Sequence, residues 1–379
     1  MTNRRNQIEH FGAGSIRKAE ALLAEYGIRS CFLVADGVAY DASGARNHLQ
    51  ATFRQLDRLT TFTNFASNPT LEAVRSALAA AEGSVYDCVI AVGGGTAIDI
   101  AKLVSVTMES DLNELISGAT EPTRKPLLLA IPTTAGTGSE ATHFAVLYID
   151  GTKHSIARQD VLPDVALIDP DLLASAPSSV MAHTGLDAIS QCIESAWSIL
   201  STSDSIDFAL EGLKLGIDNI RGAVDLSNTL SLEAMARSAH LSGKAINISK
   251  TTASHALSYH LTTAFGIPHG LAVALTIPPL IQYNAAISET DCNDSRGADY
   301  VRSTVTEVCA QFTEVTSDQT AGALTQLLSD LGLSPRLRDY GICRSDLGSI
   351  VDAVNVERLG NNPRRMNQAD LFVLVQEAY

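Results

Sequence analysis

The chain has 379 residues, of which 45% are hydrophobic and 18% are charged, and such a composition is ordinary for a globular protein of two domains or two lobes. The formal net charge of −15 at pH 7 argues against nucleic acid or an anionic membrane as a partner. It also means that an anionic substrate would need a local positive centre. No apolar run of the sequence is long enough to span a bilayer.

The six cysteines and the first residues bear on the compartment in which the protein works. No two cysteines have the CxxC spacing of redox motifs or zinc knots, since they stand at positions 31, 88, 192, 292, 309 and 343. Reduced thiols and a cytoplasmic location are therefore expected. The stretch Met1–His10 carries two arginines but no apolar segment, so we expect no signal peptide.

The first half of the chain alternates short apolar runs with amphipathic stretches. Strands are predicted over Ser30–Val34, Leu59–Phe65, Tyr86–Val92, Pro126–Ile131 and Val165–Ile168. Helices are predicted over Leu71–Ala81, after the cap Asn68-Pro69-Thr70, and over Thr96–Val106. Strands separated by helices indicate a parallel sheet that is covered on both faces.

The second half has few strand-like runs. Its amphipathic stretches predict helices over Ala182–Ser198, Ser203–Ile220, Ser231–Ile246, Ala253–Thr263, Leu271–Tyr283, Tyr300–Gln311 and Gln319–Leu331. Pro170 and Pro177 mark the change of pattern. We therefore expect an α/β lobe over residues 1–174 and an all-α lobe over residues 175–379.

Three glycines, Gly93-Gly94-Gly95, follow the predicted strand that ends at Val92 and precede a helix. Glycine lets the backbone approach a ligand closely, and the start of the helix offers free N–H groups and a positive dipole end to a phosphate. The sequence is neither GxGxxG nor a P-loop. By itself the turn is equally compatible with an ordinary tight strand-to-helix connection.

Two further segments indicate a dinucleotide. The loop Pro132–Glu140, which follows another predicted strand, is dense in hydroxyl groups and small residues and can present several donors to phosphates and ribose. Asp36 stands just after the strand over Ser30–Val34. An acidic residue there can bind ribose hydroxyls and repel a 2′-phosphate, which favours NAD(H) over NADP(H). The alternative for Asp36 is an ordinary turn residue.

One carboxylate and two histidines form a candidate metal site. Asp187 lies on a predicted helix in an apolar setting, where a charged group needs a partner. His255 and His269 follow on later segments. Together with water these side chains would suit catalytic zinc or ferrous iron. Buried, hydrogen-bonded histidines are the alternative.

These segments together resemble the iron-containing (group III) alcohol dehydrogenase family. Gly93–Thr96 with Asp99 and Lys102 is similar to the glycine signature of that family, and Pro132–Glu140 is similar to its threonine loop. The resemblance implies the dehydroquinate synthase-like fold, with an N-terminal dinucleotide-binding lobe and a C-terminal helical lobe. It also implies that the dinucleotide contacts Asp36, Asn68, Gly94, Gly95, Thr96, Asp99, Thr133, Thr134, Thr137 and Leu172, and that the metal ligands include Asp187, His255 and His269.

The chain departs from the family pattern at two positions. The family usually places a histidine ligand one helical turn after the aspartate, where this chain has Gln191. The i, i+4 spacing keeps both side chains on one face, but an amide oxygen is a weaker ligand than imidazole. The metal set is therefore Asp187, Gln191, His255 and His269, or the three strong ligands alone. The weaker ligand makes Fe²⁺ less secure and favours Zn²⁺ more, and loss of the metal is the alternative. Tyr259 replaces a further active-site histidine of many members, and either donates a proton or packs.

The segment Ser242–Ala256 is similar to the corresponding segment of the phosphonoacetaldehyde reductases within this family. Lys250 lies shortly before His255 and supplies the cation that a phosphonate would need. Lys244 could add to it. The alternative for both lysines is a solvated helix face.

We therefore expect a cytoplasmic, metal-dependent dehydrogenase that uses NAD(H) to reduce a small anionic aldehyde to a primary alcohol. Phosphonoacetaldehyde, reduced to 2-hydroxyethylphosphonate in phosphonate biosynthesis, is the expected substrate. Tyr259, His260 and Lys250 are the expected catalytic side chains, and a homodimer is the expected assembly. The alternatives are a general short-chain alcohol or polyol dehydrogenase, a lyase like dehydroquinate synthase, and a non-catalytic nucleotide-binding regulator.

Overall fold

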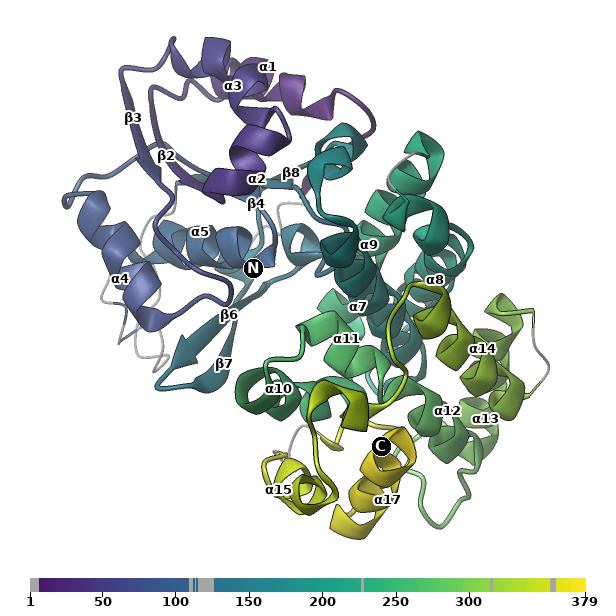
Figure 1. The fold of residues 1–379 in the computed structure, drawn as a ribbon. Coiled ribbons are helices and arrows are strands. Elements are labelled where there is room, and N and C mark those ends of the chain that lie inside the picture. The colour runs from purple at the N-terminus through teal and green to yellow at the C-terminus, as the bar shows by residue number, and fades with distance from the viewer. Residues whose placement is uncertain are drawn as a thin grey trace. The chain divides into compact units, whose positions relative to one another are not determined.

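A computed structural model describes residues 7–108, 112, 114, 126–225, 228–313, 316–354 and 359–379. The two arginines of the N-terminal stretch lie outside these residues. The chain separates into two compact units, Met1–Pro177 and Ser178–Tyr379, whose elements are labelled in Figure 1. The predicted division between residues 174 and 175 falls inside η4, a 3-10 helix over Pro170–Ser175 at the end of the first unit.

The first unit contains a six-stranded sheet in the order β1-β8-β5-β4-β2-β3. Every neighbouring pair in this sheet is parallel. The strands are β1 (Ile8–Phe11), β2 (Ser30–Ala35), β3 (Arg58–Phe62), β4 (Cys88–Gly93), β5 (Leu127–Pro132) and β8 (Val165–Ile168). The predicted parallel sheet is therefore confirmed, and β1 is an edge strand that was not expected because its four residues carry too short a pattern.

Helices cover both faces of this sheet (Figure 1). One core joins the sheet to α1 (Lys18–Glu25), α2 (Gly37–Ala42) and α3 (Ala45–Phe53), and the other joins it to α4 (Leu71–Ala80) and α5 (Gly95–Thr107). Successive residues of a strand point to opposite faces, so Leu33 belongs to the first core and Phe32 to the second. Burial on both faces explains why the strands read as continuous apolar runs.

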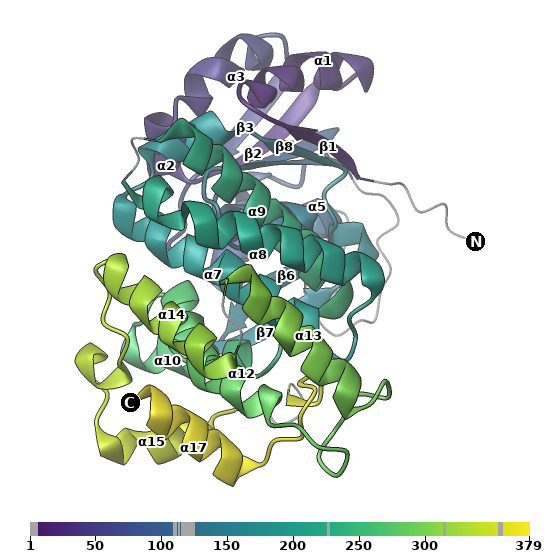
Figure 2. The same cartoon turned by 90° about the vertical axis from the view of Figure 1, so that its right-hand side faces the viewer.

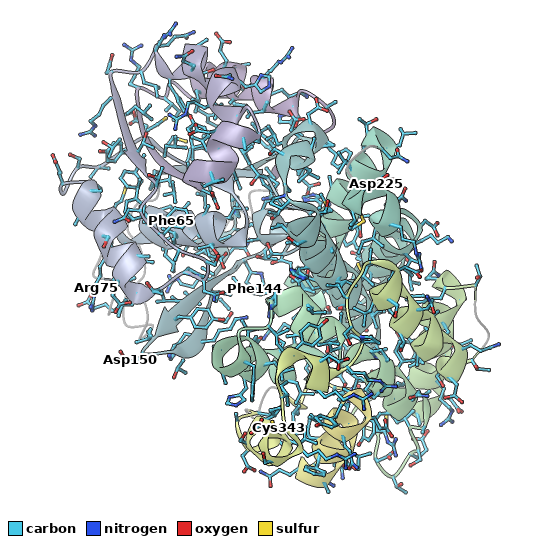
Figure 3. All side chains as sticks on the ribbon, viewed as in Figure 1. Phe65, Arg75, Phe144, Asp150, Asp225 and Cys343 are labelled. Atoms are coloured by element: carbon cyan, nitrogen blue, oxygen red, sulfur yellow. The ribbon has the colours of Figure 1, made fainter. Side chains whose placement is uncertain are left out.

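An antiparallel hairpin of β6 (Phe144–Ile149) and β7 (Thr152–Ala157) follows the threonine-rich loop. Phe144 at its start and Asp150 at its turn are labelled in Figure 3. Asp150 and Gly151 both adopt positive φ angles, 49° and 76°. These angles are those of the two-residue turns that join right-twisted strands, for which Asp-Gly is a preferred sequence.

The second unit is built mainly of helices. They are α7 (Ser178–Trp197), α8 (Ser203–Val224), α9 (Thr229–Ser249), α10 (Ala253–Phe265), α11 (His269–Ala274), α12 (Ile277–Ala285), α13 (Ala298–Gln311), α14 (Ser317–Asp330), α15 (Leu347–Asp352) and α17 (Gln368–Ala378). Helices α7, α8 and α9 lie side by side (Figure 2). A Cβ at Gly216 would lie 2.7 Å from Cγ1 of Ile189, so a side chain there would force α8 away from α7.

The single helix predicted over Leu271–Tyr283 is wrong, because the structure has α11 and α12 in its place. Pro278 and Pro279 explain the break. Proline has no N–H and cannot continue a helix through its interior, but it fits the first turn of a new helix. The start of α12 at Ile277 places these prolines there.

All six cysteines are free thiols, and the exposed Cys343 is labelled in Figure 3. Among the described helices, none combines the length and the apolar character that a membrane crossing needs.

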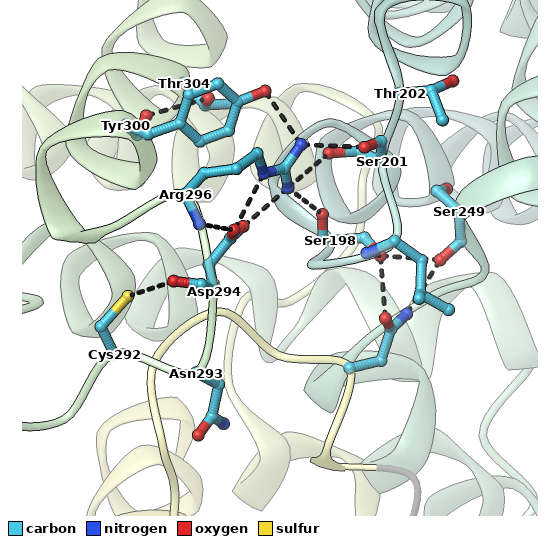
Figure 4. A network of polar contacts seen from close by, with 12 residues as sticks. Ser198, Ser201, Thr202, Ser249, Cys292, Asn293, Asp294, Arg296, Tyr300 and Thr304 are labelled. Carbon is cyan, nitrogen blue, oxygen red and sulfur yellow. Dashed lines mark hydrogen bonds and ion pairs between the residues drawn. The ribbon is translucent and has the colours of Figure 1, made fainter.

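A buried ion pair fixes the C-terminal end of α7, the helix that carries Asp187 (Figure 4). The guanidinium of Arg296 donates to the carbonyl oxygens of Ser198 at 3.0 Å and Ser201 at 2.8 Å. It also pairs with Asp294 at 2.6 Å, whose side chain is 1% exposed. Carbonyls at the end of a helix lack partners within it, and Arg296 supplies donors to those that follow α7.

We expect Arg296→Met to lower the free energy of unfolding by about 3 kcal/mol, because it leaves the carboxylate of Asp294 buried without its partner. Denaturant unfolding followed by circular dichroism measures the loss. Arg237→Met is the control, since Arg237 pairs with Glu211 at the surface, where both side chains are about half exposed, and such pairs contribute little. Equal losses in the two variants would contradict this role of Arg296.

Candidate functional site

The glycine turn between β4 and α5 packs so closely against its neighbours that the turn has no space for side chains. Gly93 has a φ of 151° and a Cβ there would lie 2.8 Å from Cβ of Ala97. A Cβ at Gly95 would lie 2.9 Å from Oγ1 of Thr137, and one at Gly94 would lie 3.2 Å from Oγ1 of Thr134. Helix α5 begins at Gly95 without a side-chain cap. Its first N–H groups are therefore disposed to bind a phosphate.

The threonine loop lies against this turn and is held by buried polar groups. The hydroxyl of Thr133 is buried and makes no hydrogen bond within the described residues. Asp99 accepts a hydrogen bond from the hydroxyl of Ser139 at 2.6 Å and one from the N–H of Val146 at 3.0 Å. Lys102 is fully buried, and its Nζ lies 3.8 Å from Oδ1 of Asp99. Burial raises the pKa of Asp99, although Lys102 and the two hydrogen bonds oppose the shift.

The remaining predicted dinucleotide contacts lie in the same unit. Asp36 caps α2 by accepting from the N–H groups of Val38 and Ala39, and its Cβ lies 3.1 Å from the position of a Cβ on Gly93. Asn68 donates its N–H to the hydroxyl of Thr96 at 3.2 Å. The structure thus brings Asp36, Asn68, Thr96, Thr134 and Thr137 to the glycine turn. Leu172 is buried in the core on the α1–α3 side of the sheet.

The second unit brings Asp187 on α7, His255 on α10 and His269 on α11 together. One ligand atom from each lies within 4.8 Å of the others. Nε2 of His255 lies 3.4 Å and Nε2 of His269 lies 3.8 Å from Oδ1 of Asp187. Nε2 of His255 is buried and makes no hydrogen bond within the described residues. A carboxylate oxygen and two imidazole nitrogens that converge in this way fit a divalent metal ion.

Close packing of α11 on α7 sets the position of His269. A Cβ at Gly270 would lie 2.0 Å from the carbonyl oxygen of His183 and 2.8 Å from Cβ of Asp187. Any residue other than glycine would therefore push His269 away from Asp187. The motif Pro268-His269-Gly270 places the ligand immediately before the residue that permits the contact.

Glu194 on α7 is a site residue that we did not predict from the sequence. It is 0% exposed and accepts from the hydroxyl of Thr252 at 2.7 Å, from the N–H of Ser254 at 2.8 Å and from Nδ1 of His255. A carboxylate only accepts, so Nδ1 carries a proton, and Nε2 is the atom that would bind a metal ion once the ion displaces the Nε2 proton. Burial by itself lowers the pKa of His255, but Glu194 and Asp187 outweigh it and raise that pKa to about 10.

Gln191 lies between Asp187 and α9. Its amide Nε2 donates to Oδ2 of Asp187 at 3.1 Å, and its Oε1 accepts from the hydroxyl of Ser242 at 2.9 Å. Both polar ends of the amide are thus in hydrogen bonds with protein groups.

Two of the predicted catalytic side chains, Tyr259 and His260, make different ring contacts. The ring of Tyr259 stacks on His269, with centroids 6.1 Å apart and planes 7° apart. His260, the next residue on α10, packs its ring against Phe265 at 5.9 Å instead. Of the two rings, Tyr259 is the one for which the structure gives a contact with His269.

The two predicted anion-binding lysines also differ. Lys250 is exposed and follows α9 with a φ of 60°. Asn361 donates to the carbonyl oxygens of Ser249 and Thr251, both at 2.9 Å, which fixes the backbone on either side of Lys250. Lys244 lies over the ring of Phe208 on α8, 4.8 Å from its centroid.

An uncapped helix start over a glycine turn suits a phosphate, and a carboxylate that faces two imidazoles suits a divalent metal ion. The chain belongs to the iron-containing alcohol dehydrogenase family. Residues 7–170 match the iron-containing alcohol dehydrogenase domain, and residues 181–379 match the C-terminal domain of the Fe-containing alcohol dehydrogenase family. The predicted family, fold and enzyme class are confirmed.

Individual relatives agree with the family. The chain is 33% identical to the phosphonoacetaldehyde reductase of Streptomyces viridochromogenes, over 77% of this chain and 76% of that protein. It is 30% identical to long-chain-alcohol dehydrogenase 1 of Geobacillus thermodenitrificans, over 98% and 95% of the two chains. The crystal structure of sulfoacetaldehyde reductase from Bifidobacterium kashiwanohense in complex with NAD⁺ is 26% identical, with a TM-score of 0.87 and coverage of 99% and 97%. The chain is thus an oxidoreductase of the alcohol dehydrogenase or aldehyde reductase type.

We expect Gly95→Ala to weaken NADH binding at least about tenfold, a loss of about 1.4 kcal/mol, because the new Cβ would displace Thr137 from the turn. Titration of NADH fluorescence measures the affinity. Gly322→Ala on α14 is the control, since a Cβ there meets no atom within 4 Å. Unchanged NADH affinity in Gly95→Ala would show that the dinucleotide does not bind at this turn.

We expect Glu194→Gln to lower the affinity for Co²⁺ by about 10- to 100-fold. The amide of glutamine can present a donor to Nδ1 of His255, which favours the tautomer whose proton sits on Nε2. Competition with a chromophoric chelator measures the affinity. Glu211→Gln is the control, because Glu211 lies at the surface with Arg237. If both variants hold Co²⁺ as the unmodified protein does, Glu194 does not orient a ligand.

Proposed function

We propose that the protein reduces a small aldehyde with an anionic head group to the primary alcohol, using NADH and one divalent metal ion, Fe²⁺ or Zn²⁺. Phosphonoacetaldehyde, reduced to 2-hydroxyethylphosphonate, is the proposed substrate. The observation that carries the reaction type is the convergence of Asp187, His255 and His269. The names of two relatives, a phosphonoacetaldehyde reductase and a sulfoacetaldehyde reductase, support an acetaldehyde with a charged substituent.

The choice of NADH rests on Asp36. This carboxylate stands directly after β2 and beside the glycine turn. A carboxylate in that place can accept hydrogen bonds from the adenosine ribose and repels the 2′-phosphate of NADPH. The N–H groups at the start of α5 would bind the pyrophosphate.

The two units contribute different parts of the reaction. When bound, the metal would supply a Lewis acid for the carbonyl oxygen and NADH would supply the hydride. Asp187, His255 and His269 would hold the metal, and the hydrogen bond from Nδ1 of His255 to Glu194 directs Nε2 toward the metal position. Tyr259, stacked on His269, would donate the proton that completes the alcohol. The hydride and this proton account for the two hydrogens that the aldehyde gains.

Lys250 is the proposed contact for the anionic head group. The net charge of −15 repels an anion, so a specific cation is needed near the substrate. Lys250 is exposed, its backbone is fixed on both sides by Asn361, and it stands five residues before His255 in the sequence. A bulky residue with positive φ is strained, and such strain is retained where the surrounding structure enforces it. Lys244, in contact with Phe208, is the weaker candidate.

We expect Lys250→Met to raise the KM for phosphonoacetaldehyde by about 10- to 100-fold, as lost charged hydrogen bonds typically do, and to leave kcat/KM for propanal unchanged. Steady-state NADH oxidation with phosphonoacetaldehyde, propanal and acetaldehyde measures both. Lys244→Met is the matched control and should change neither.

The same substrate series tests the competing functions. A kcat/KM for propanal that equals or exceeds that for phosphonoacetaldehyde would favour the general short-chain alcohol dehydrogenase, and relatives such as the long-chain-alcohol dehydrogenase make this the principal alternative. Turnover without net NADH consumption would favour the lyase. Absence of turnover together with retained nucleotide binding would favour the regulator.

A further inference from the structure

We propose that Gln191 is a positioning residue for Asp187 and not a metal ligand, so that three protein side chains hold the metal. This inference rests on the proposed metal site. It concerns position 191, where the family pattern usually has a histidine ligand and this chain has glutamine.

The three ligands share a pattern in which the outer polar atom contacts a protein group and the inner atom faces the metal position. Nδ1 of His255 bonds to Glu194, and Nδ1 of His269 lies 3.2 Å from the hydroxyl of Ser258. That hydroxyl donates to the carbonyl of His255 at 2.7 Å, so it accepts from Nδ1 of His269. The inner atoms are then Nε2 of both histidines.

Gln191 stands in the outer layer of this pattern. Oδ2 of Asp187 accepts from Nε2 of Gln191 at 3.1 Å, which leaves Oδ1 as the atom that faces both histidines. Gln191 therefore orients Asp187 by bonding its outer polar atom, just as Glu194 orients His255. Partners of this kind orient ligating carboxylates and imidazoles and raise metal affinity.

The amide of Gln191 cannot easily turn to offer its oxygen to a metal. Turning it would place Oε1 against Oδ2 of Asp187, and two acceptors would then face each other in a buried site. Gln191 and Asp187 are 4% and 3% exposed, so water cannot readily replace the lost bonds.

Gln191→Met tests the inference, because methionine keeps the length of the side chain and removes both hydrogen bonds. We expect the affinity for Co²⁺ to fall about 10- to 100-fold. At saturating Co²⁺ the visible d–d absorption bands should match those of the unmodified protein, because the ligands are the same. Gln191→His is the positive control, since an added imidazole should shift the bands.

Ser242→Ala provides a second, milder variant should Gln191→Met fold poorly. Loss of the Ser242 hydroxyl leaves the amide less firmly held, so the Co²⁺ affinity should fall by less than in Gln191→Met, again without a change in the bands. Shifted bands in Gln191→Met would overturn the inference, as would unchanged affinity in both variants. If the unmodified protein binds no Co²⁺, the proposed metal site itself is wrong.

Discussion

The carboxylate of Glu194 is fully buried, and three donors hold it there. A buried charge without such partners costs several kcal/mol, so α10 cannot move away from α7 without a large loss of stability. Trp197 adds to this arrangement because its Nε1–H donates to the hydroxyl of Thr252 at 3.1 Å, which leaves the Thr252 hydrogen for Glu194. The geometry of the proposed metal ligands and the stability of the helical unit therefore depend on the same hydrogen bonds.

In the first unit, close packing between the glycine turn and the threonine loop determines the geometry of the proposed dinucleotide site. The glycine turn, where we propose that the dinucleotide binds, consists of residues without side chains, and the threonine loop fills the volume that side chains would take. The buried pair of Asp99 and Lys102 keeps that loop in place, since Lys102 donates to the hydroxyl of Thr142 and to the carbonyl of Phe144. A substitution at the turn would thus act on the loop first and on a bound dinucleotide through it.

Much of the fold follows from local sequence patterns. Buried strands read as apolar runs, and β8 begins and ends where it was predicted. The Asp150-Gly151 turn is a local signal for the β6–β7 hairpin, and Pro278-Pro279 marks the break between α11 and α12. Local patterns do not report which distant side chains meet. The sequence could therefore indicate Asp187, His255 and His269 as residue types that bind metals, but not their hydrogen-bond partners.

Glu194 is an example of a residue whose partner cannot be identified from local sequence patterns. It stands seven residues after Asp187 on α7, in the apolar stretch Cys192-Ile193-Glu194-Ser195-Ala196, and a charge at that spacing on one helix face predicts a buried partner. Its partner, however, is 61 residues away in the sequence. Only the packing of α10 on α7 reveals that the partner is His255.

The three ligand side chains differ in their access to solvent. The side chain of His269 is 30% exposed, whereas those of Asp187 and His255 are 4% and 6% exposed. An ion that enters or leaves is therefore expected to exchange its first protein bond at His269, while the other two ligands stay oriented by their partners. The rate at which the protein gains and loses metal would then be set at His269, and the strength with which it retains the ion would be set by the buried hydrogen bonds behind Asp187 and His255.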